Sequence, residues 1–319
     1  MKKILVVGAY GQIGSELTVA LRNIYGVENV IASDKKTEPC ESLKNGPFAY
    51  VDATNKDSIL EIVKKYKIDA IVHLAAILSA NGEKNPMLAW NVNMNGLLNV
   101  LEIAREYKME RVFVPSSIAV FGPTTPADNT PQETILQPTT MYGLTKVSGE
   151  LLCNYYVNKY GLDIRGVRYP GIISYDTLPG GGTTDYAVAI YYDAIKYKKY
   201  TCFVKADTML PMMYMPDCLK ASTDLFQADF SKLKHHCNFN VGSMSFTVTE
   251  LAASIKKYIP DFEIIYAPDY RQAIADSWPN SLDDSAARKE WGWKPSYDLD
   301  SMTRDMLEKL GEKHKKGLI

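Results

Sequence analysis

The amino-acid sequence predicts an α/β protein built on a doubly wound parallel sheet. Short apolar runs alternate with longer segments of helical periodicity over the first half of the chain. The first run, residues 4–7, is apolar at every position, as expected for a strand that is covered on both faces. Three glycines at every third position then join this run to a helix; they are Gly8, Gly11 and Gly14. These observations indicate a sheet of the Rossmann type.

The glycine-rich turn predicts a site for a dinucleotide. Gly8 permits the tight turn, Gly11 lets the backbone approach a pyrophosphate, and Gly14 lets the helix pack against the strand. Gln12 and Ile13 open the helix, whose free N–H groups would face the phosphates. Three glycines alone are a weak signal. Here they follow a strand and begin a helix, which is the context that the site requires.

The second strand, predicted at residues 29–34, ends in the acid Asp34. A carboxylate at this position accepts hydrogen bonds from the adenosine ribose diol and would repel a 2′-phosphate. The sequence therefore favours NAD over NADP. Lys35 and Lys36 follow immediately, and their positive charge is the evidence in favour of NADP. Asp34 could also be an ordinary polar residue at the end of a strand.

The remaining elements follow the same alternation. We expect strands at residues 48–51, 70–76, 111–117 and 163–168, and helices at 56–66, 91–107 and 141–160. After about residue 173 a glycine-rich loop at 180–185 leads into a helix at 186–196. Asp217 is expected to be the N-cap of another helix, followed by a strand at 239–241 and a helix at 249–258. We predict a dinucleotide-binding region (1–175) and a smaller C-terminal α/β substrate-binding region (176–319), with the chain crossing back to the sheet near 212–245.

Composition limits the classes of partner. The chain has 319 residues, 46% hydrophobic and 23% charged, with a net charge of −1, which argues against nucleic acid or an anionic membrane as the main partner. Five scattered cysteines and the lack of a signal or membrane-spanning run predict a cytoplasmic protein with free thiols. We expect no metal site: His73 is interpreted as a packed strand residue and His235-His236 as a turn.

Tyr142 and Lys146 are four residues apart, so a helix presents both side chains on one face. An ammonium beside a phenol can lower the pKa of the phenol from its usual ~10 and make it a base near neutrality. This spacing is common by chance on surface helices. It gains weight from the glycine-rich turn and from Ser116-Ser117, which end a predicted strand.

With these residues, the motifs Asn93-x-x-Gly96-x-x-Asn99, Ser117 to Gly122, Asn240-Val241-Gly242 and Trp291 to Pro295 resemble the extended short-chain dehydrogenase/reductase superfamily along almost the entire chain. The resemblance implies that Tyr142 is the general base or acid, that Lys146 lowers its pKa and binds the nicotinamide ribose, and that Ser117 orients the reacting hydroxyl. Ser116 ranks below Ser117, which lies five residues before Gly122. The coenzyme site is further expected to include Asp52, Ala53, Leu74, Ala75, Ala76, Asn93, Tyr169, Pro170 and Ile172.

Most extended members of the superfamily act on nucleotide-sugars and carry an Arg-Asp pair before a C-terminal helix. Here the matching stretch, residues 210–217, has Pro211 and Met212 in its place, and no arginine occurs between Arg168 and Arg271. A diphosphate needs cationic and preferably bidentate partners. The sequence therefore predicts a poor site for a nucleotide diphosphate, although lysines remain.

The same stretch, with residues 11–14, 180–186 and 275–279, resembles the short-chain family of L-threonine 3-dehydrogenases. This implies oxidation of L-threonine by NAD to 2-amino-3-oxobutanoate, in threonine catabolism to glycine, and a homodimer formed through the helices near residues 91 and 141. A nucleotide-sugar epimerase or dehydratase and a non-catalytic dinucleotide sensor are the alternatives.

The residues expected at the substrate each have a second interpretation. Ser79, Thr183 and Thr184 are predicted to bind the carboxylate or amine, or else to be solvated loop residues. Asp185 would place the amine or cap the next helix, and Trp278 could form a lid. Gly180 to Gly182 would let the loop close over the substrate.

Overall fold

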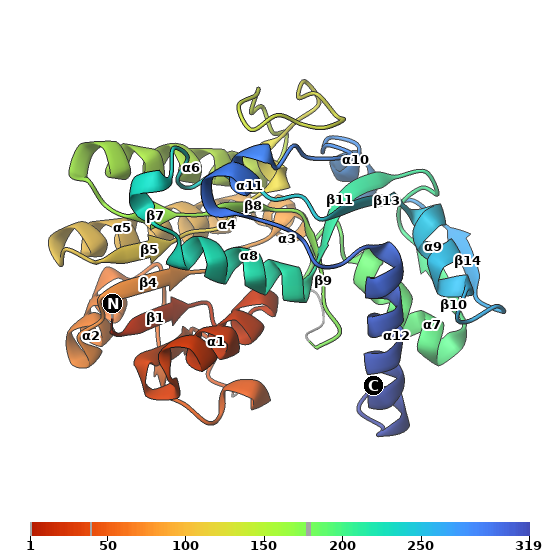
Figure 1. The fold of residues 1–319 in the computed structure, drawn as a ribbon, viewed down its shortest axis with the longest axis horizontal. Helices are drawn as coiled ribbons and strands as arrows, with labels where there is room; N and C mark the ends of the chain where they lie inside the picture. Colours follow the sequence, from red (N-terminus) through yellow and green to blue (C-terminus); the bar gives the residue numbers. More distant parts are fainter. Residues whose placement is uncertain (1, 39, 177–179) are drawn as a thin grey trace.

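A computed structural model describes residues 2–38, 40–176 and 180–319. Its centre is a six-stranded parallel sheet, which confirms the predicted fold class (Figure 1). Leu5 of the first strand pairs with Ile31 on one side and Ile71 on the other. In spatial order the strands are β3 (Phe48–Tyr50), β2 (Val30–Asp34), β1 (Ile4–Val7), β4 (Ala70–His73), β5 (Arg111–Phe113) and β7 (Ile164–Arg165).

Helices cover both faces of this sheet because its strands are apolar on both faces. Ile4 and Val6 pack in one buried cluster with α1 (Gln12–Tyr25) and α8 (Met215–Gln227). Leu5 and Val7 point the other way and pack with α2 (Lys56–Tyr66), α5 (Gly96–Glu106) and α6 (Met141–Tyr160). This arrangement follows from the two-residue repeat of a strand. It places the start of α1 and the start of α6 at the carboxyl edge of the sheet.

Two of the expected strands are each divided between two sheets. Residues 111–117 form β5 and then β6 (Ser116–Ser117), and residues 163–168 form β7 and then β8 (Val167–Tyr169). Strands β6, β8 and β12 (Phe239–Asn240) make a separate parallel sheet. Pro115 lacks the N–H that a ladder needs, and a Cβ on Gly166 would lie 2.0 Å from the Val114 carbonyl oxygen. The break carries Ser117 out of the main sheet.

Three further predictions about element boundaries were wrong. The helix expected to start at 91 begins at α4 (Pro86–Trp90), where proline is favoured in the first turn, and continues through a π-helical turn at Asn91–Asn95. Strand β4 ends at His73 rather than at residue 76. Asp217 does not cap α8: it lies in the first turn and accepts backbone hydrogen bonds from Ser296 and Tyr297 at 2.8 and 3.1 Å.

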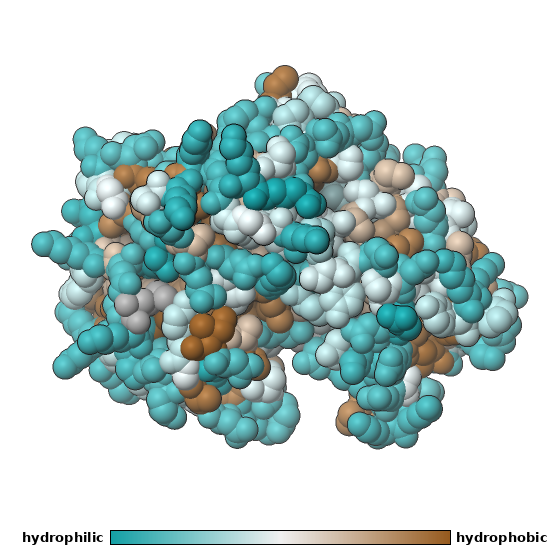
Figure 2. Space-filling model, in the orientation of Figure 1, coloured by the Kyte–Doolittle hydropathy of each residue, from teal (hydrophilic) through white to brown (hydrophobic). Residues whose placement is uncertain are grey.

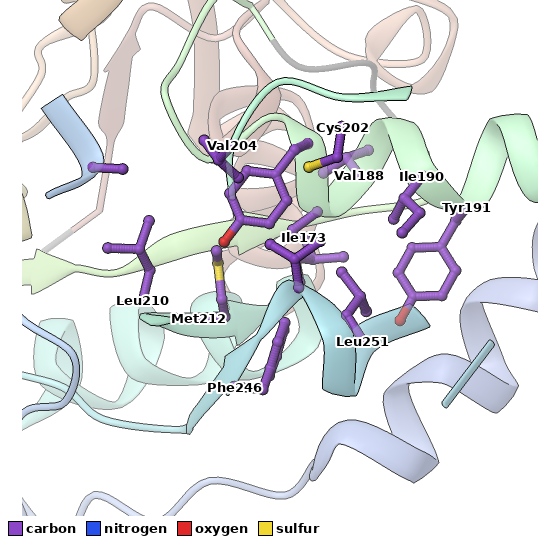
Figure 3. Close-up of a cluster of buried hydrophobic side chains, with 14 of the residues drawn as sticks. Ile173, Val188, Ile190, Tyr191, Cys202, Val204, Leu210, Met212, Phe246 and Leu251 are labelled. Atoms are coloured by element: carbon purple, nitrogen blue, oxygen red, sulfur yellow. The ribbon is translucent and has the colours of Figure 1, made fainter. Parts of the chain in front are cut away.

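The C-terminal region has its own core, in which apolar side chains of helices and strands interlock. Met212, Phe246 and Leu251 meet Tyr191 and Ile173 there (Figure 3). Its strands are β9 (Gly171–Ile173), β11 (Met209–Tyr214) and β13 (Met244–Thr247) in one sheet, and β10 (Lys199–Cys202) and β14 (Glu263–Tyr266) in another. Its helices are α7 (Tyr186–Tyr197), α9 (Val248–Lys256), α10 (Arg271–Ala275) and α12 (Leu299–Lys315). Helix α11 (Ser285–Trp291) packs instead in the first region, against β12.

The two regions are interleaved in sequence. Between β11 and β13 the chain returns to the first region, where α8 packs beside α1 and β12 pairs with β8. A notch separates the part that carries α1 from the C-terminal helix α12 (Figure 2). Trp293 is buried, as expected of a core residue. No helix in the described part of the chain has the length and hydrophobicity to cross a membrane.

Candidate active site

A cavity of about 210 Å³ opens between the glycine-rich turn, the start of α6 and the loop before α7. Its lining includes every residue predicted to be catalytic or to bind substrate, although these come from five separate parts of the chain. They are Ser79, Ser117, Tyr142, Lys146, Thr183, Thr184, Asp185 and Trp278. Of the residues predicted at the coenzyme, Gly8, Gly11, Gln12, Ile13, Gly14, Leu74, Ala76, Tyr169, Pro170 and Ile172 also line it.

The glycine-rich turn has the shape that a pyrophosphate needs. Gly8 has φ +90°, and a Cβ there would lie 2.6 Å from the Ala75 nitrogen. A Cβ on Gly14 would lie 2.2 Å from the Gly8 carbonyl oxygen, so the helix can approach the strand only at a glycine. A Cβ on Gly11 would lie 3.5 Å from the Gly8 carbonyl oxygen, an ordinary van der Waals contact, and no side chain caps α1. The uncapped N–H groups of α1 therefore suit a phosphate.

A second cavity adjoins the turn at the ends of β2 and β3. Asp34, Asp52, Ala53, Ala75 and Ala76, five of the residues expected at the coenzyme, line it. Backbone N–H groups of Tyr10 and Lys36 each donate to the Asp34 carboxylate at 3.0 Å. Lys35 forms an ion pair with Asp52 at 2.7 Å. Leu88, Asn91 and Val92 also line this cavity and were not predicted to contact the coenzyme.

Tyr142 and Lys146 lie in the first two turns of α6, whose start is held against the turn that follows Ser117. The Thr140 hydroxyl caps the helix by accepting from the Gly143 N–H at 3.0 Å. A Cβ on Gly143 would lie 2.2 Å from the Ala119 carbonyl oxygen, so only glycine allows this approach. The close packing brings the Tyr142 hydroxyl within hydrogen-bonding reach of Ser117.

Burial controls the charge of both groups. It raises the pKa of Tyr142 to about 12, and the hydrogen bond with Ser117 acts in the opposite direction. It also lowers the pKa of Lys146 to about 8. The Lys146 Nζ lies 5.6 Å from the centre of the Tyr142 ring and donates to the Pro115 carbonyl at 2.8 Å. The expected lowering of the Tyr142 pKa by Lys146 is therefore not found: desolvation is the largest effect on the phenol, and the hydrogen bond with Ser117 is the effect that opposes it.

The two adjacent serines differ in their hydrogen bonds. The Ser116 hydroxyl is buried and donates to the Glu150 carboxylate, which also pairs with Arg168. Ser117 Oγ accepts from the Ala119 N–H at 3.2 Å and bonds to Tyr142. Ser117 is thus the serine that contacts the tyrosine, and Ser116 is held by a structural network.

Hydroxyls from distant segments meet on the substrate side. Ser79, at the start of α3 (Ser79–Lys84), lies 3.1 Å from Thr183 between their side-chain oxygens, and both are buried. Asp185 accepts from the backbone N–H groups of Gly181 and Gly182 at 3.0 and 2.8 Å. Asp185 occupies the N-cap position of α7, as one of the two predicted alternatives has it, although its side chain makes no capping hydrogen bond to the helix. Burial raises the pKa of its carboxyl.

Two predicted residues have other surroundings. Asn93 lines neither the cavity at the glycine-rich turn nor the one at Asp34: its amide bonds to the Ile77 backbone and to the Thr145 hydroxyl. Asn93 therefore acts on a coenzyme indirectly, by holding the backbone of Ile77 in the loop after β4. Trp278 is 8% exposed and packs in the C-terminal core, so it forms a fixed wall of the cavity in this structure. Leu78 and Ile118 line the cavity without having been predicted, and their apolar character gave no signal.

The residues present fit a dinucleotide, and comparison with known proteins agrees. The model of the NAD dependent epimerase/dehydratase family matches residues 4–242, so this chain belongs to that family. It is an enzyme of the oxidoreductase type that uses a nicotinamide coenzyme. The predicted membership of an epimerase-like superfamily is confirmed.

The most similar proteins fall in two groups by name. An L-threonine dehydrogenase structure from Clostridium difficile has a TM-score of 0.95 and 59% identity, and covers 98% of each chain. A holo L-threonine dehydrogenase from Cupriavidus necator has a TM-score of 0.94 and 52% identity over 97% of this chain and 99% of its own. An uncharacterised epimerase/dehydratase of Staphylococcus saprophyticus is 51% identical over 99% of both chains. The predicted resemblance to L-threonine 3-dehydrogenases is thereby confirmed as a similarity.

Two other structures bear on the alternatives. A UDP-glucose 4-epimerase from Thermotoga maritima has a TM-score of 0.85 at 22% identity over 99% of this chain and all of its own, which shows the shared fold. An L-threonine 3-dehydrogenase at 50% identity, covering 97% of this chain and 99% of its own, is described as monomeric.

Proposed function

We propose that this protein is an NAD-dependent L-threonine 3-dehydrogenase, which oxidises the C3 hydroxyl of L-threonine to give 2-amino-3-oxobutanoate, the first step of threonine catabolism to glycine. The observation that carries the proposal is the meeting of two sets of residues in one cavity. Ser117, Tyr142 and Lys146 provide acid–base chemistry beside the glycine-rich turn, and Ser79 and Thr183 provide a pair of hydroxyls opposite.

Tyr142 is the base that removes the proton of the C3 hydroxyl. Ser117 holds that hydroxyl in line with the phenol, which requires positioning within hydrogen-bond distance. Lys146 keeps a positive charge beside the phenol up to a pH of about 8, where burial places its pKa. NAD would be held by the glycine-rich turn, Asp34 and Lys146, and it would supply the acceptor for the hydride that leaves C3.

The walls of the cavity suit a small zwitterion. The hydroxyls of Ser79, Thr183 and Thr184 can donate to the amino-acid carboxylate, and the Asp185 carboxylate can accept from the ammonium. No arginine of the described residues lines the cavity, so a diphosphate would lack its bidentate partner. This absence favours an amino acid over a nucleotide-sugar as substrate.

NAD rather than NADP is the proposed coenzyme. Asp34 is held in place by two backbone N–H groups at the edge of the adenosine cavity. Its negative charge suits a ribose diol and opposes a 2′-phosphate. The neighbouring Lys35 is neutralised by its ion pair with Asp52.

We further propose a homodimer formed through α4, α5 and α6. Large apolar side chains are exposed on these three helices. A single exposed apolar residue is normal on a protein surface, whereas several on neighbouring helices indicate a surface that binds another protein. They include Met87 and Leu88 on α4, Leu98 on α5, and Leu144, Leu151 and Tyr155 on α6.

The test is NADH formation at 340 nm with purified protein, NAD and L-threonine. D-threonine, L-allo-threonine and L-serine serve as matched substrates, and Tyr142→Phe serves as the matched variant. We expect selective turnover of L-threonine, a loss of at least about 100-fold in kcat for Tyr142→Phe, and unchanged NAD binding. No turnover, with a UDP-sugar raising the melting temperature, would instead support an epimerase or dehydratase.

A further inference from the structure

A third cavity, of about 30 Å³ and here called the internal cavity, is lined on one side by Lys146. The cavity of about 210 Å³ at the glycine-rich turn is here called the substrate cavity. Three residues line both cavities and form the partition between them: Pro115, Ser116 and Lys146. The far walls of the internal cavity include His73 and Glu150. The mechanism above uses neither of them.

His73 is the last residue of β4 and is 4% exposed. Its Nδ1 is buried and has no hydrogen-bond partner among the described residues. Burial, and then the charge of Lys146, lower the pKa of His73 to about 3, so the imidazole is neutral at physiological pH. A neutral imidazole can accept one hydrogen bond, and a buried acceptor is normally paired.

The other polar groups around the internal cavity already have partners. The Thr145 hydroxyl donates to the Tyr142 carbonyl at 2.8 Å and accepts from Asn93 at 3.0 Å. The Ser116 hydroxyl donates to Glu150. Lys146 carries three N–H groups, and one of them reaches the Pro115 carbonyl at 2.8 Å. The groups that can form a further hydrogen bond are therefore the Lys146 ammonium, the His73 Nδ1 atom and the carboxylate oxygens of Glu150.

The cavity has the size and the polarity of a water site. A water requires roughly 10–15 Å³ of accessible volume and two to four polar partners. The internal cavity provides about 30 Å³, with a cation, a neutral acceptor and a carboxylate on its walls. A water in this position can accept from Lys146 and donate to His73 and to Glu150.

We propose that His73 is a positioning residue for Lys146, holding the ammonium at the partition through a water bound in the internal cavity. The proposal rests on the proposed function, in which a charged Lys146 assists Tyr142. It adds a residue that lies on the opposite side of Lys146 from the substrate.

The charge of Lys146 depends on the titratable groups that surround it. These are Tyr142, Glu150 and Cys153 on α6, His73 on β4, and Cys237 before β12. Glu150 and Cys153 favour the ammonium, whereas burial opposes it. A bound water that accepts from the ammonium favours the charged form further, so its loss makes Lys146 deprotonate at a lower pH.

The experiment compares His73→Leu with His73→Asn. An asparagine oxygen lies close to the position of Nδ1 and restores an acceptor, whereas leucine of similar bulk removes it. For His73→Leu we expect the alkaline limb of the kcat profile to move down by about one pH unit, which is about tenfold in the equilibrium. At pH 8, close to the parent pKa of Lys146, kcat should fall about fivefold, while KM for L-threonine stays within about twofold. His73→Asn should follow the parent profile.

A crystal structure of the parent protein is the second measurement, and it does not depend on turnover. We expect an ordered water within hydrogen-bond distance of His73 Nδ1 and Lys146 Nζ. A dry cavity, or superimposable pH profiles for all three proteins, would overturn the inference even if L-threonine is oxidised. If the parent protein does not oxidise L-threonine, the proposed function fails, and the water remains the test of the site.

Discussion

At the scale of single residues, the candidate site depends on burial as much as on residue type. Tyr142 and Lys146 are one helical turn apart, but desolvation moves their pKa values in opposite directions, to about 12 and about 8. Each group is thereby less stable in its charged form. Tyr142 is therefore protonated at neutral pH in this structure.

Thr183→Val tests the role of the hydroxyl pair. Valine has the same shape, so the variant loses the hydroxyl that lies 3.1 Å from Ser79 while the buried volume stays filled. A hydrogen bond to a charged group contributes about 1.5 kcal/mol or more, so KM for L-threonine should rise at least about tenfold. The measurement is the initial rate against L-threonine concentration. Thr201→Val, at an exposed position of β10, is the control, and an equal rise in both would contradict the role.

Glu16→Gln tests a buried carboxyl at the junction of α1 with the end of β9. Burial raises the pKa of Glu16 from 4.5 to about 7, and Ser174 donates a hydrogen bond to it at 2.6 Å. The folded state therefore holds this proton more tightly than the unfolded state. The contribution of Glu16 to stability is fully present below pH 4.5 and is lost as the pH rises to about 7.

Glutamine stays neutral, so Glu16→Gln should be more stable than the parent at pH 8, by up to about 3 kcal/mol. The gain should vanish near pH 4. Urea unfolding at both pH values measures it, with Glu61→Gln on the exposed face of α2 as the control. A gain that does not depend on pH would mean that the effect comes from packing and not from the titration of Glu16.

At the scale of elements, Asp217 joins the first turn of α8 to the segment before α12. Its carboxylate is 1% exposed and accepts from the Ser296 and Tyr297 backbone and from the Ser243 hydroxyl. The side chain therefore connects three elements that are far apart in sequence. The sequence pattern identified Asp217 as a helix-start residue but could not show which N–H groups it would meet.

Asp217→Ala should lower the free energy of unfolding by about 1–3 kcal/mol, because two partly buried N–H groups lose their acceptor. Asp217→Asn keeps one acceptor oxygen and should lose less. Chemical unfolding of the three proteins provides the comparison. Equal stability of the alanine variant and the parent would show that water replaces the carboxylate.

The boundaries of elements were predictable where the signal is local. The helix at residues 56–66 has the predicted bounds, and Asn55 caps it. The break at Pro115 and Gly166 was not predicted, although both residues were visible in the sequence. Its cause is the approach of Gly166 to the Val114 carbonyl, a contact between two strands that only the folded sheet defines.

At the scale of the whole molecule, the exposed apolar face of α4, α5 and α6 leads to a prediction about assembly. Leu151 on α6 is 64% exposed, and a glutamate there would place a charge in the proposed interface. We expect Leu151→Glu to elute as a monomer where the parent elutes as a dimer, with the mass measured by light scattering. Leu318, 67% exposed near the C-terminus, is the matched position, and Leu318→Glu should leave the dimer intact. A parent protein that elutes as a monomer would contradict the proposed homodimer.

The sequence by itself determined the order of strands and helices, the glycine-rich turn, Asp34 and the pairing of Tyr142 with Lys146. These features depend on spacings of a few residues, which the periods of strands and helices convert directly into geometry. The tertiary structure alone decided three others: the meeting of Ser79 with Thr183 across 104 residues, the raised pKa of Tyr142, and the cavity that His73 shares with Lys146. Each depends on which distant surfaces are packed together and on how much water that packing excludes, and no short stretch of sequence contains that information.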